Sequence, residues 1–370
     1  MINKYMYQVD LFTTLSESVC LPHFLKVRMT HKKLDILQIN LLAGEARGLS
    51  TLPKDAIDAL VEASAPVLKT VFAMGGDEIN DNGNRLADNR RIMAYDWRTD
   101  TWTEMPYTLP PAYIANDPKR AGSAQIDDRT IVMYNEWAND SNNLFIFRPD
   151  SPTGKFTNFP SKETLWRQVD RTINPPLALR DGRLLCIGGK GTYTREVGVM
   201  IIADEKGFRK LDVRLTERHH MFCTVLENGD VLMTGGNNYN YVAHADCYIF
   251  RVATNTLDKV ASMNHPRAYH SGCLLPNGDV MVVGGQTNGV GDRPAATEIY
   301  NVHTNTWTIR ETPLDSHGKY RMVPLPTGKI LVFSGQRDNV YMLYDPVENR
   351  VIPRRLPFIF VFMNIVPYYQ

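Results

Sequence analysis

A short motif recurs through most of this chain, and it constrains the fold more than any other feature of the sequence. In its clearest form the motif is Asn-Gly-Asp, then four mainly apolar residues, then two glycines. Its copies, some of them decayed, occupy residues 71–76, 128–135, 181–189, 228–236, 277–285 and 327–335. Their spacing of 47 to 59 residues indicates structural modules that stack and bury a shared core between neighbours.

Each copy of the motif predicts a β-hairpin that ends in a bend. Asn-Gly and Asp-Gly favour tight hairpin turns because these residues adopt positive φ angles at little cost. The apolar runs on either side of the turn, such as residues 223–226 and 231–234, match strands that are buried on both faces. The closing glycine pair lets the backbone bend where a side chain would clash.

A pair of large side chains with six residues between them marks a second hairpin in several units. The pairs are Tyr95 with Trp102 and Tyr300 with Trp307, and weaker versions are Phe250 with Leu257 and Tyr344 with Val351. A fixed offset that returns in unit after unit is typical of residues that pack one module against the next.

The glycine pair followed by Tyr-x6-Trp resembles the kelch repeat, and the resemblance covers residues 68–355. It implies an all-β fold, a β-propeller of four-stranded antiparallel blades in which the glycine pair ends the second strand of each blade. We expect seven blades rather than six, because the flanking residues are numerous enough for one more blade.

The residues that flank the repeats are expected to close the ring. The chain then divides into an N-terminal extension, the kelch propeller blades and a C-terminal closing strand, at residues 1–67, 68–355 and 356–370. In the extension we predict strands at 24–29 and 34–42 and one short helix at 54–64, where Pro53 suits the first helical turn.

The C-terminal segment begins with residues 356–362, which are apolar and uncharged. An exposed edge of this kind promotes aggregation. We therefore predict that the segment is buried, either paired with an N-terminal strand in a shared blade or docked on the first blade. The alternative is a ring of six blades with a free C-terminal tail.

Composition excludes several classes of protein. The chain has 370 residues, of which 43% are hydrophobic and 22% charged, as expected of a soluble globular protein rather than a disordered one. Its 41 basic and 40 acidic residues give a net charge of +1, so we expect no nucleic-acid partner that bulk charge would attract.

Cysteine usage and hydropathy indicate an intracellular protein. The five cysteines form no Cys-x-x-Cys pair, which predicts reduced, buried thiols. The first residues lack the apolar core of a signal peptide, and no run of 18 apolar residues occurs. We therefore expect a cytoplasmic or intracellular location and no membrane partner.

One constellation suggests an enzyme. Cys223 and Tyr269 stand near the starts of equivalent strands in the two best-preserved units, and His270 follows directly. These residues resemble the galactose oxidase and glyoxal oxidase family of copper radical enzymes, in which such a Cys and Tyr join through a thioether. The resemblance implies a copper cofactor and oxidation of alcohols or aldehydes.

The copper ligand set of that family is incomplete in this sequence. A later Tyr-His pair is expected, but Tyr320 is followed by Arg321. The competing interpretation is that Cys223 is a small buried hydrophobe and Tyr269 a satisfied channel residue. A weaker candidate for a metal site is the group of four histidines His219, His220, His265 and His270. We expect no metal or other cofactor.

Loops after the glycine pairs carry the remaining information. Their Tyr and Asn residues suit binding surfaces, because Tyr offers rigid apolar area and Asn adaptable hydrogen bonding. The candidate partner-binding residues are Thr194, which follows Tyr193, and Asn238, Tyr239, Tyr241 and Arg293. We therefore expect a non-catalytic module that presents loops to a protein partner or a larger assembly. The alternative is the copper oxidase. If the loops are ordinary solvated loops, they carry neither function.

Overall fold

The computed structural model describes most of the repeat region and little of the N-terminal extension. The described residues are 7–8, 26–27, 67–75, 77–79, 85–88, 90–110, 121–135, 144–151, 156–158, 177–187, 199–204, 207–216, 218–238, 240–287, 297–314, 320–333, 340–356, 360–361 and 364–369. The chain separates into two units, Met1–Pro66 and Val67–Gln370. In the first unit, β1 (Tyr7–Gln8) and β2 (Lys26–Val27) pair antiparallel.

Five sheets of the second unit are each made of four strands that follow one another in the chain, and we call these sheets blades. Their strands are β8 (Ala121–Asp127), β9 (Thr130–Asn135), β10 (Leu144–Phe147) and β11 (Phe156–Asn158); β12 (Leu177–Ala178), β13 (Leu184–Ile187), β14 (Val199–Asp204) and β15 (Gly207–Arg214); β16 (Phe222–Val225), β17 (Val231–Thr234), β18 (Cys247–Arg251) and β19 (Thr256–Val260); β20 (Ser271–Leu274), β21 (Val280–Val283), β22 (Thr297–Asn301) and β23 (Thr306–Arg310); and β24 (Arg321–Pro324), β25 (Ile330–Phe333), β26 (Val340–Asp345) and β27 (Arg350–Arg355).

A further four-stranded sheet, which we call the closing sheet, combines segments from both ends of this unit. Its order is β29-β3-β6-β7, with β3 (Leu68–Met74), β6 (Ile92–Asp96), β7 (Thr101–Glu104) and β29 (Asn364–Tyr369). The antiparallel ladder between β29 and β3 runs from Asn364 opposite Met74 to Tyr369 opposite Leu68. Beside it, β28 (Phe360–Val361), β4 (Asp77–Ile79) and β5 (Arg85–Asp88) form a three-stranded sheet.

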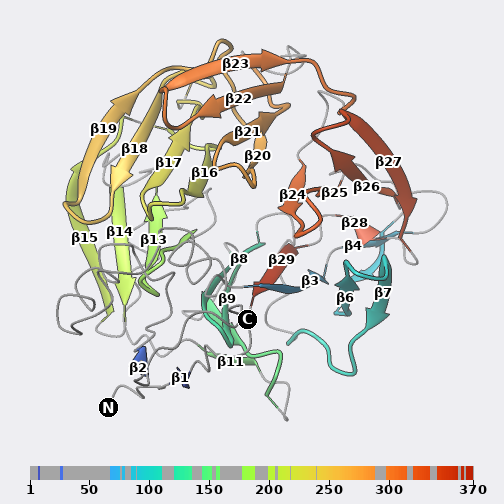
Figure 1. Cartoon of the computed structure of the whole chain (residues 1–370). Coiled ribbons are helices and arrows are strands. Elements are labelled where there is room, and N and C mark those ends of the chain that lie inside the picture. Colours follow the sequence, from blue (N-terminus) through green and yellow to red (C-terminus); the bar gives the residue numbers. More distant parts are fainter. Residues whose placement is uncertain are drawn as a thin grey trace, which may run out of the picture. The chain divides into compact units, whose positions relative to one another are not determined.

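Within the unit Val67–Gln370, neighbouring sheets share apolar cores. Phe72 of the closing sheet meets Phe147 of blade β8–β11 with ring centroids 5.6 Å apart, and Val71 shares a core cluster with Leu331 of blade β24–β27. In Figure 1 the strands β8, β16, β20, β24 and β29 gather near the middle of this unit, and β15, β19, β23 and β27 lie at its periphery. The unit is therefore an all-β propeller of four-stranded antiparallel blades.

The predicted blade count is wrong. In the residues that it describes, the structure has five blades made of consecutive strands together with the closing sheet, and neither a seven-bladed ring nor a six-bladed ring with a free tail. The reason is that the C-terminal strand joins the edge of β3 instead of building a separate blade with the N-terminal extension. The helix predicted at 54–64 and the strand at 34–42 lie outside the described residues, as does most of 24–29.

The burial predicted for residues 356–362 is tested only in part. Leu356 is buried in the core between blade β24–β27 and the closing sheet, and β28 pairs with β4. The strand that completes the closing sheet is β29, which follows residues 356–362 and lies within the predicted closing segment 356–370. Among the residues that the structure describes, no helix occurs that is long and apolar enough to span a bilayer.

The hairpin predicted from Asn-Gly is confirmed at Gly229. Its φ angle is 88°, and its N–H donates to the carbonyl of Leu226 across the turn between β16 and β17. The Tyr-x6-Trp spacing also has a structural cause, because Tyr95 stands directly opposite Trp102 in the β6–β7 ladder, with ring centroids 4.9 Å apart.

The tyrosine of this pair also fixes the turn that follows it. In three sheets the phenol donates a hydrogen bond to an Asp or Asn five residues later, whose backbone has a positive φ angle. The pairs are Tyr95 with Asp100 (2.8 Å), Tyr300 with Asn305 (2.9 Å) and Tyr344 with Asn349 (2.9 Å). Blade β16–β19 has Phe250 in the tyrosine position, so the buried Oδ1 of Asn255 has no hydrogen-bond partner among the described residues.

The change Phe250→Tyr should therefore stabilise the protein. The added hydroxyl would reach Asn255 Oδ1 as in the other three sheets, and one such hydrogen bond contributes about 0.5–1.5 kcal/mol. Chemical denaturation should show a higher free energy of unfolding. Tyr300→Phe is the matched control and should lower the free energy of unfolding by a similar amount; a Phe250→Tyr protein no more stable than the parent would contradict the argument.

Deletion of residues 364–370 should abolish cooperative folding of the propeller. The deletion removes the buried side chains of Ile365, Val366 and Tyr368. Burial of each contributes roughly 1.5–3 kcal/mol, which together is comparable to a net stability of about 5–15 kcal/mol. Solubility and thermal unfolding measure the effect, with deletion of Gln370 alone as the control. A soluble deletion variant with an unchanged melting temperature would show that the ring does not depend on β29.

Candidate functional site

Two buried arginines anchor the segments that lead into β16 and β20. Arg218 and Arg267 occupy equivalent positions, each four residues before its strand, and their exposed fractions are 2% and 0%. Each donates a hydrogen bond to the carbonyl of the first glycine of a pair, Arg218 to Gly235 (3.2 Å) and Arg267 to Gly284 (2.9 Å). The repeated glycines thus serve as docking points for the arginine-bearing segments.

The glycine at position 235 is required by close packing as well as by its backbone angle. Its φ is 56°, and a Cβ at this position would lie 2.3 Å from the carbonyl oxygen of Arg267. That carbonyl accepts a hydrogen bond from the N–H of Gly236 (2.8 Å). The side-chain clash expected from the sequence is therefore confirmed, and the clashing group belongs to the segment before the next blade.

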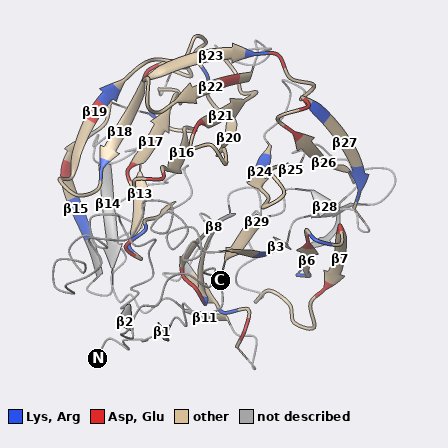
Figure 2. Ribbon diagram, in the orientation of Figure 1, with Lys and Arg blue, Asp and Glu red and all other residues tan. Residues whose placement is uncertain are grey.

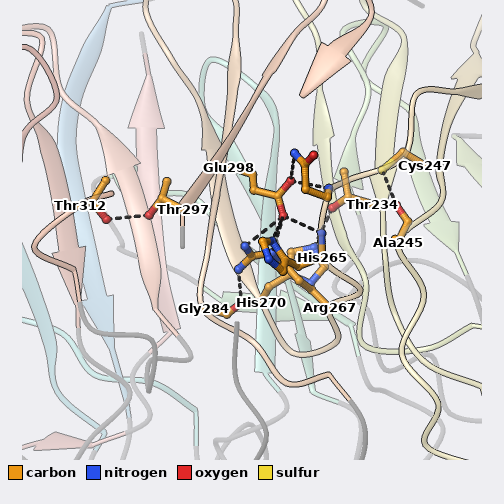
Figure 3. A network of polar contacts seen from close by, with 11 residues as sticks. Thr234, Ala245, Cys247, His265, Arg267, His270, Gly284, Thr297, Glu298 and Thr312 are labelled. Atoms are coloured by element: carbon orange, nitrogen blue, oxygen red, sulfur yellow. Dashed lines mark hydrogen bonds and ion pairs between the residues drawn. The ribbon is translucent and has the colours of Figure 1, made fainter. Parts of the chain in front are cut away.

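Glu298 on β22 is the acceptor at the centre of a buried polar network (Figure 3). Its carboxylate, with an exposed fraction of 0%, accepts hydrogen bonds from Arg267 Nη2 (3.1 Å), the backbone N–H of Asn264 (2.6 Å) and that of His265 (3.1 Å). Burial by itself raises the pKa of Glu298, but the hydrogen bonds from Asn264 and the charge of Arg267 outweigh it and lower the pKa. The network holds residues 264–267 against blade β20–β23.

Arg218 has an equivalent anchor in blade β16–β19. Its Nη2 lies 2.5 Å from Oδ2 of Asp246, which also accepts a hydrogen bond from the Tyr248 hydroxyl (2.9 Å). Burial would raise the pKa of Asp246, but the hydrogen bond and charge of Arg218 lower it below its usual value. Both anchors therefore keep a carboxylate ionised beside a buried guanidinium.

The two anchored segments and the loop between β17 and β18 carry a row of rings, which we call the Tyr–His row: Tyr241 from the loop, and His219, His220 and Tyr269 from the segments. Successive ring centroids are 6.5, 5.0 and 3.7 Å apart, and the rings of His220 and Tyr269 are stacked with an interplanar angle of 24°. His220 and Tyr269 each lie two residues before an innermost strand and share a φ of 58°, a conformation uncommon for residues other than glycine. The row crosses from one blade to the next.

The loop at one end of the row contains a hydrogen-bonded turn and exposes apolar side chains. Tyr241 and Val242 have exposed fractions of 58% and 47%. Asn238 fixes the turn beneath them, because its Oδ1 accepts hydrogen bonds from the backbone N–H groups of Asn240 (3.0 Å) and Val242 (3.1 Å). Adjacent exposed apolar residues on an ordered turn are typical of a contact surface.

Of the predicted partner-binding residues, the structure describes Asn238 and Tyr241 and places them in this one loop. Thr194, Tyr239 and Arg293 lie outside the described residues. In the sequence, His219 and His220 were only a weak candidate for a metal site, and nothing there connected them with the loop. The signal available was the equivalent position of His220 and Tyr269 in consecutive repeats, which predicts two rings side by side on neighbouring blades.

The predicted oxidase residues point in different directions. Cys223 packs into the core between blades β12–β15 and β16–β19, and burial raises the pKa of its thiol to about 12. The adjacent Phe222 packs on the other side, against blade β20–β23, as expected because neighbouring residues of a strand face opposite sides. The thiol therefore faces away from the blade that carries Tyr269.

His270 also leaves the surface that Tyr269 occupies. Its Nε2 lies 2.8 Å from Thr234 Oγ1 in the core, and burial together with the charge of Arg267 lowers its pKa to about 3, so the ring is neutral. The described residues contain no group of three or more His, Cys, Asp or Glu side chains that could hold a metal ion. The geometry of Cys223, Tyr269 and His270 gives the copper oxidase hypothesis no support.

The fold of residues 67–370 is that of a β-propeller. Comparison with known proteins finds one relative that is similar to part of the chain. No protein-family model matches the chain. The tRNA wybutosine-synthesizing protein 4 of Saccharomyces cerevisiae is 33% identical over 91 residues. That match covers 25% of this chain and 12% of the relative, so this chain corresponds to only a small part of that protein's length.

Replacement of Glu298 by glutamine should strongly destabilise the propeller. Removing one partner of a buried ion pair leaves the other charge uncompensated and typically costs about 3–5 kcal/mol. Urea denaturation at pH 7 measures the loss. Asp258→Asn is the control, because Asp258 pairs with Arg251 at an exposed site where such a pair contributes about 0–1 kcal/mol. Equal losses in the two variants would contradict the argument.

The parent protein and Glu298→Gln also test how the stability depends on pH. The folded-state pKa of Glu298 is lowered, so its contribution is fully present above the unfolded value of about 4.3 and is lost as the pH falls through the folded-state pKa. The stability difference between the parent and Glu298→Gln should therefore shrink as the pH is lowered below about 4. A difference independent of pH would contradict the assignment.

Proposed function

We propose that this chain is a kelch-type propeller that acts as a non-catalytic binding module for a protein partner. The observation that carries the proposal is the exposed pair Tyr241 and Val242, held on a hydrogen-bonded turn at one end of the Tyr–His row. The kelch assignment is supported by the glycine pairs that receive the anchoring arginines and by the Tyr-x6-Trp contacts.

The physical properties of this surface suit recognition of a protein. Aromatic rings bury a large area at low entropic cost, and they are enriched among the residues that dominate binding energy. The backbone of Tyr241, His220 and Tyr269 has positive φ angles before any partner binds. We therefore expect these residues to lose little conformational entropy on binding. A partner would meet a surface that is fixed before contact.

The partial relative is consistent with a modular role. Its printed name describes a whole protein, and the similar segment is 12% of it. We infer that the shared segment is a propeller part that larger proteins can carry beside other parts, and we transfer neither the named synthesis nor its substrate to this chain.

The change Tyr241→Ala should weaken partner capture without affecting the fold. Loss of a central aromatic contact typically costs about 2 kcal/mol or more, equivalent to at least a roughly 30-fold lower affinity. Immobilised parent and variant proteins would be incubated with native cell extract treated with ribonuclease, and the bound proteins quantified by mass spectrometry.

The control is Val347→Ala, which changes a more accessible apolar side chain on the turn between β26 and β27, with an exposed fraction of 89%. It should leave capture unchanged. Retention of all partners by Tyr241→Ala would refute this surface, and capture of RNA alone from untreated extract would refute a protein partner.

A further inference from the structure

The outer strand of blade β20–β23 departs from a pattern that its counterparts share. Four sheets have the Tyr-x6-Trp spacing or its weaker version, and in each we compare the residue two places after the Trp position, which we call the edge residue. The edge residue is exposed in all four sheets, and it occupies the same place in the ladder with the preceding strand. The four edge residues are Glu104 on β7, Lys259 on β19, Ile309 on β23 and Pro353 on β27.

The backbone N–H and C=O of the edge residue point away from the sheet. In the closing sheet the N–H of Met105 donates to the carbonyl of Ile92 (2.9 Å). Hydrogen-bonded and non-hydrogen-bonded pairs alternate along an antiparallel ladder, so the adjacent pair of Met93 and Glu104 directs its backbone groups away from each other. Pro353 supports this assignment, because an edge strand tolerates proline where the missing N–H would face outward.

Three of the four edge residues protect the outer edge of their sheet, and Ile309 does not. A charge or a proline hinders pairing of an edge strand with another strand, and Glu104, Lys259 and Pro353 each supply one of these. Ile309 is uncharged and β-branched, and its exposed fraction is 48%. In Figure 2 the outer strands β19 and β27 carry charged segments, whereas β23 is tan up to its C-terminal end. Among the described residues, β23 pairs with β22 alone.

The sequence of β23 suits antiparallel pairing with a second copy of itself. All five residues of the two strands pair only when Thr308 lies opposite Thr308 of the second copy. This register places Ile309 opposite Trp307, and the outward backbone groups of these two residues then face each other. It places Arg310 opposite Thr306, so no like charges meet. Pairs of an aromatic with a β-branched residue and pairs of threonines stabilise antiparallel ladders.

We propose that β23 pairs with β23 of a second copy of this chain, so that two propellers associate through one continuous antiparallel sheet. The other outer strands with this spacing are less suited to such pairing. Two copies of β19 in full register would bring Asp258 against Asp258, and Pro353 lies in the middle of β27. The interface uses the same surface on both copies, so it closes at a dimer. This surface goes beyond the proposed function and does not depend on it.

Sedimentation velocity over a series of protein concentrations tests the pairing. The parent should form a dimer whose fraction rises with concentration. Ile309→Lys places on β23 the residue type that β19 carries at its edge, and it should raise the dissociation constant of the dimer at least roughly tenfold. The control is Val347→Lys, which makes a similar change at an exposed apolar residue in the turn between β26 and β27 and should leave the dimer unchanged. Tyr241→Ala should also leave it unchanged, so failure of this proposal and failure of the proposed function are distinguishable.

Disulfide cross-linking tests the register. Thr308→Cys should give a covalent dimer on non-reducing gels after mild oxidation, because residues directly opposite each other have Cα atoms about 4.5–5.5 Å apart, within the range of a disulfide. Thr306→Cys is the control, since it lies opposite Arg310 and should cross-link no more than the parent. The proposal is overturned if the parent is a monomer at every concentration, if Ile309→Lys and Val347→Lys dimerise equally, or if Thr306→Cys cross-links as readily as Thr308→Cys. Unchanged melting temperatures of the variants would show that the substitutions leave the fold intact.

Discussion

The antiparallel pairing of β29 with β3 is the contact on which the rest of the propeller depends. Every blade covers its apolar faces with its two neighbours, so the stack is complete only when its first and last sheets meet. The closing sheet provides this junction with one strand from the C-terminal end and three from the start of the unit. Its Val366 and Tyr368 share a core with blade β8–β11, while Ile365 shares one with blade β24–β27.

The glycine pairs connect this architecture to the candidate site. In blades β16–β19 and β20–β23 the pair accepts a buried arginine, and each arginine is neutralised by one carboxylate. The segments held in this way carry His220 and Tyr269 in a stacked arrangement. The same repeat device that joins the blades therefore also fixes the surface, which explains why non-glycine residues tolerate positive φ angles there.

Much of the fold follows from local sequence signals, whereas closure and the site do not. The turn at Gly229 and the facing of Tyr95 with Trp102 depend on residues close in sequence, and both were predictable. The sequence predicted closure by the C-terminal segment 356–370 but not which of its residues would pair; β29 makes the pairing despite Pro367, which an edge strand tolerates since one side of its backbone needs no partner. The stack of His220 on Tyr269 depends on how two blades pack against each other. The only sequence signal for it was that these two residues occupy equivalent positions in consecutive repeats.

Closure by β29 also sets the order of events during synthesis. Chains fold from the N-terminal end as they emerge from the ribosome, and contacts between residues far apart in sequence form slowly. The edge of β3 emerges early, but its partner is made only after nearly 300 further residues, since Met74 pairs with Asn364. Through that interval the nascent chain exposes an unpaired apolar strand edge, which is a ready site for chaperone binding or for pairing with another nascent copy.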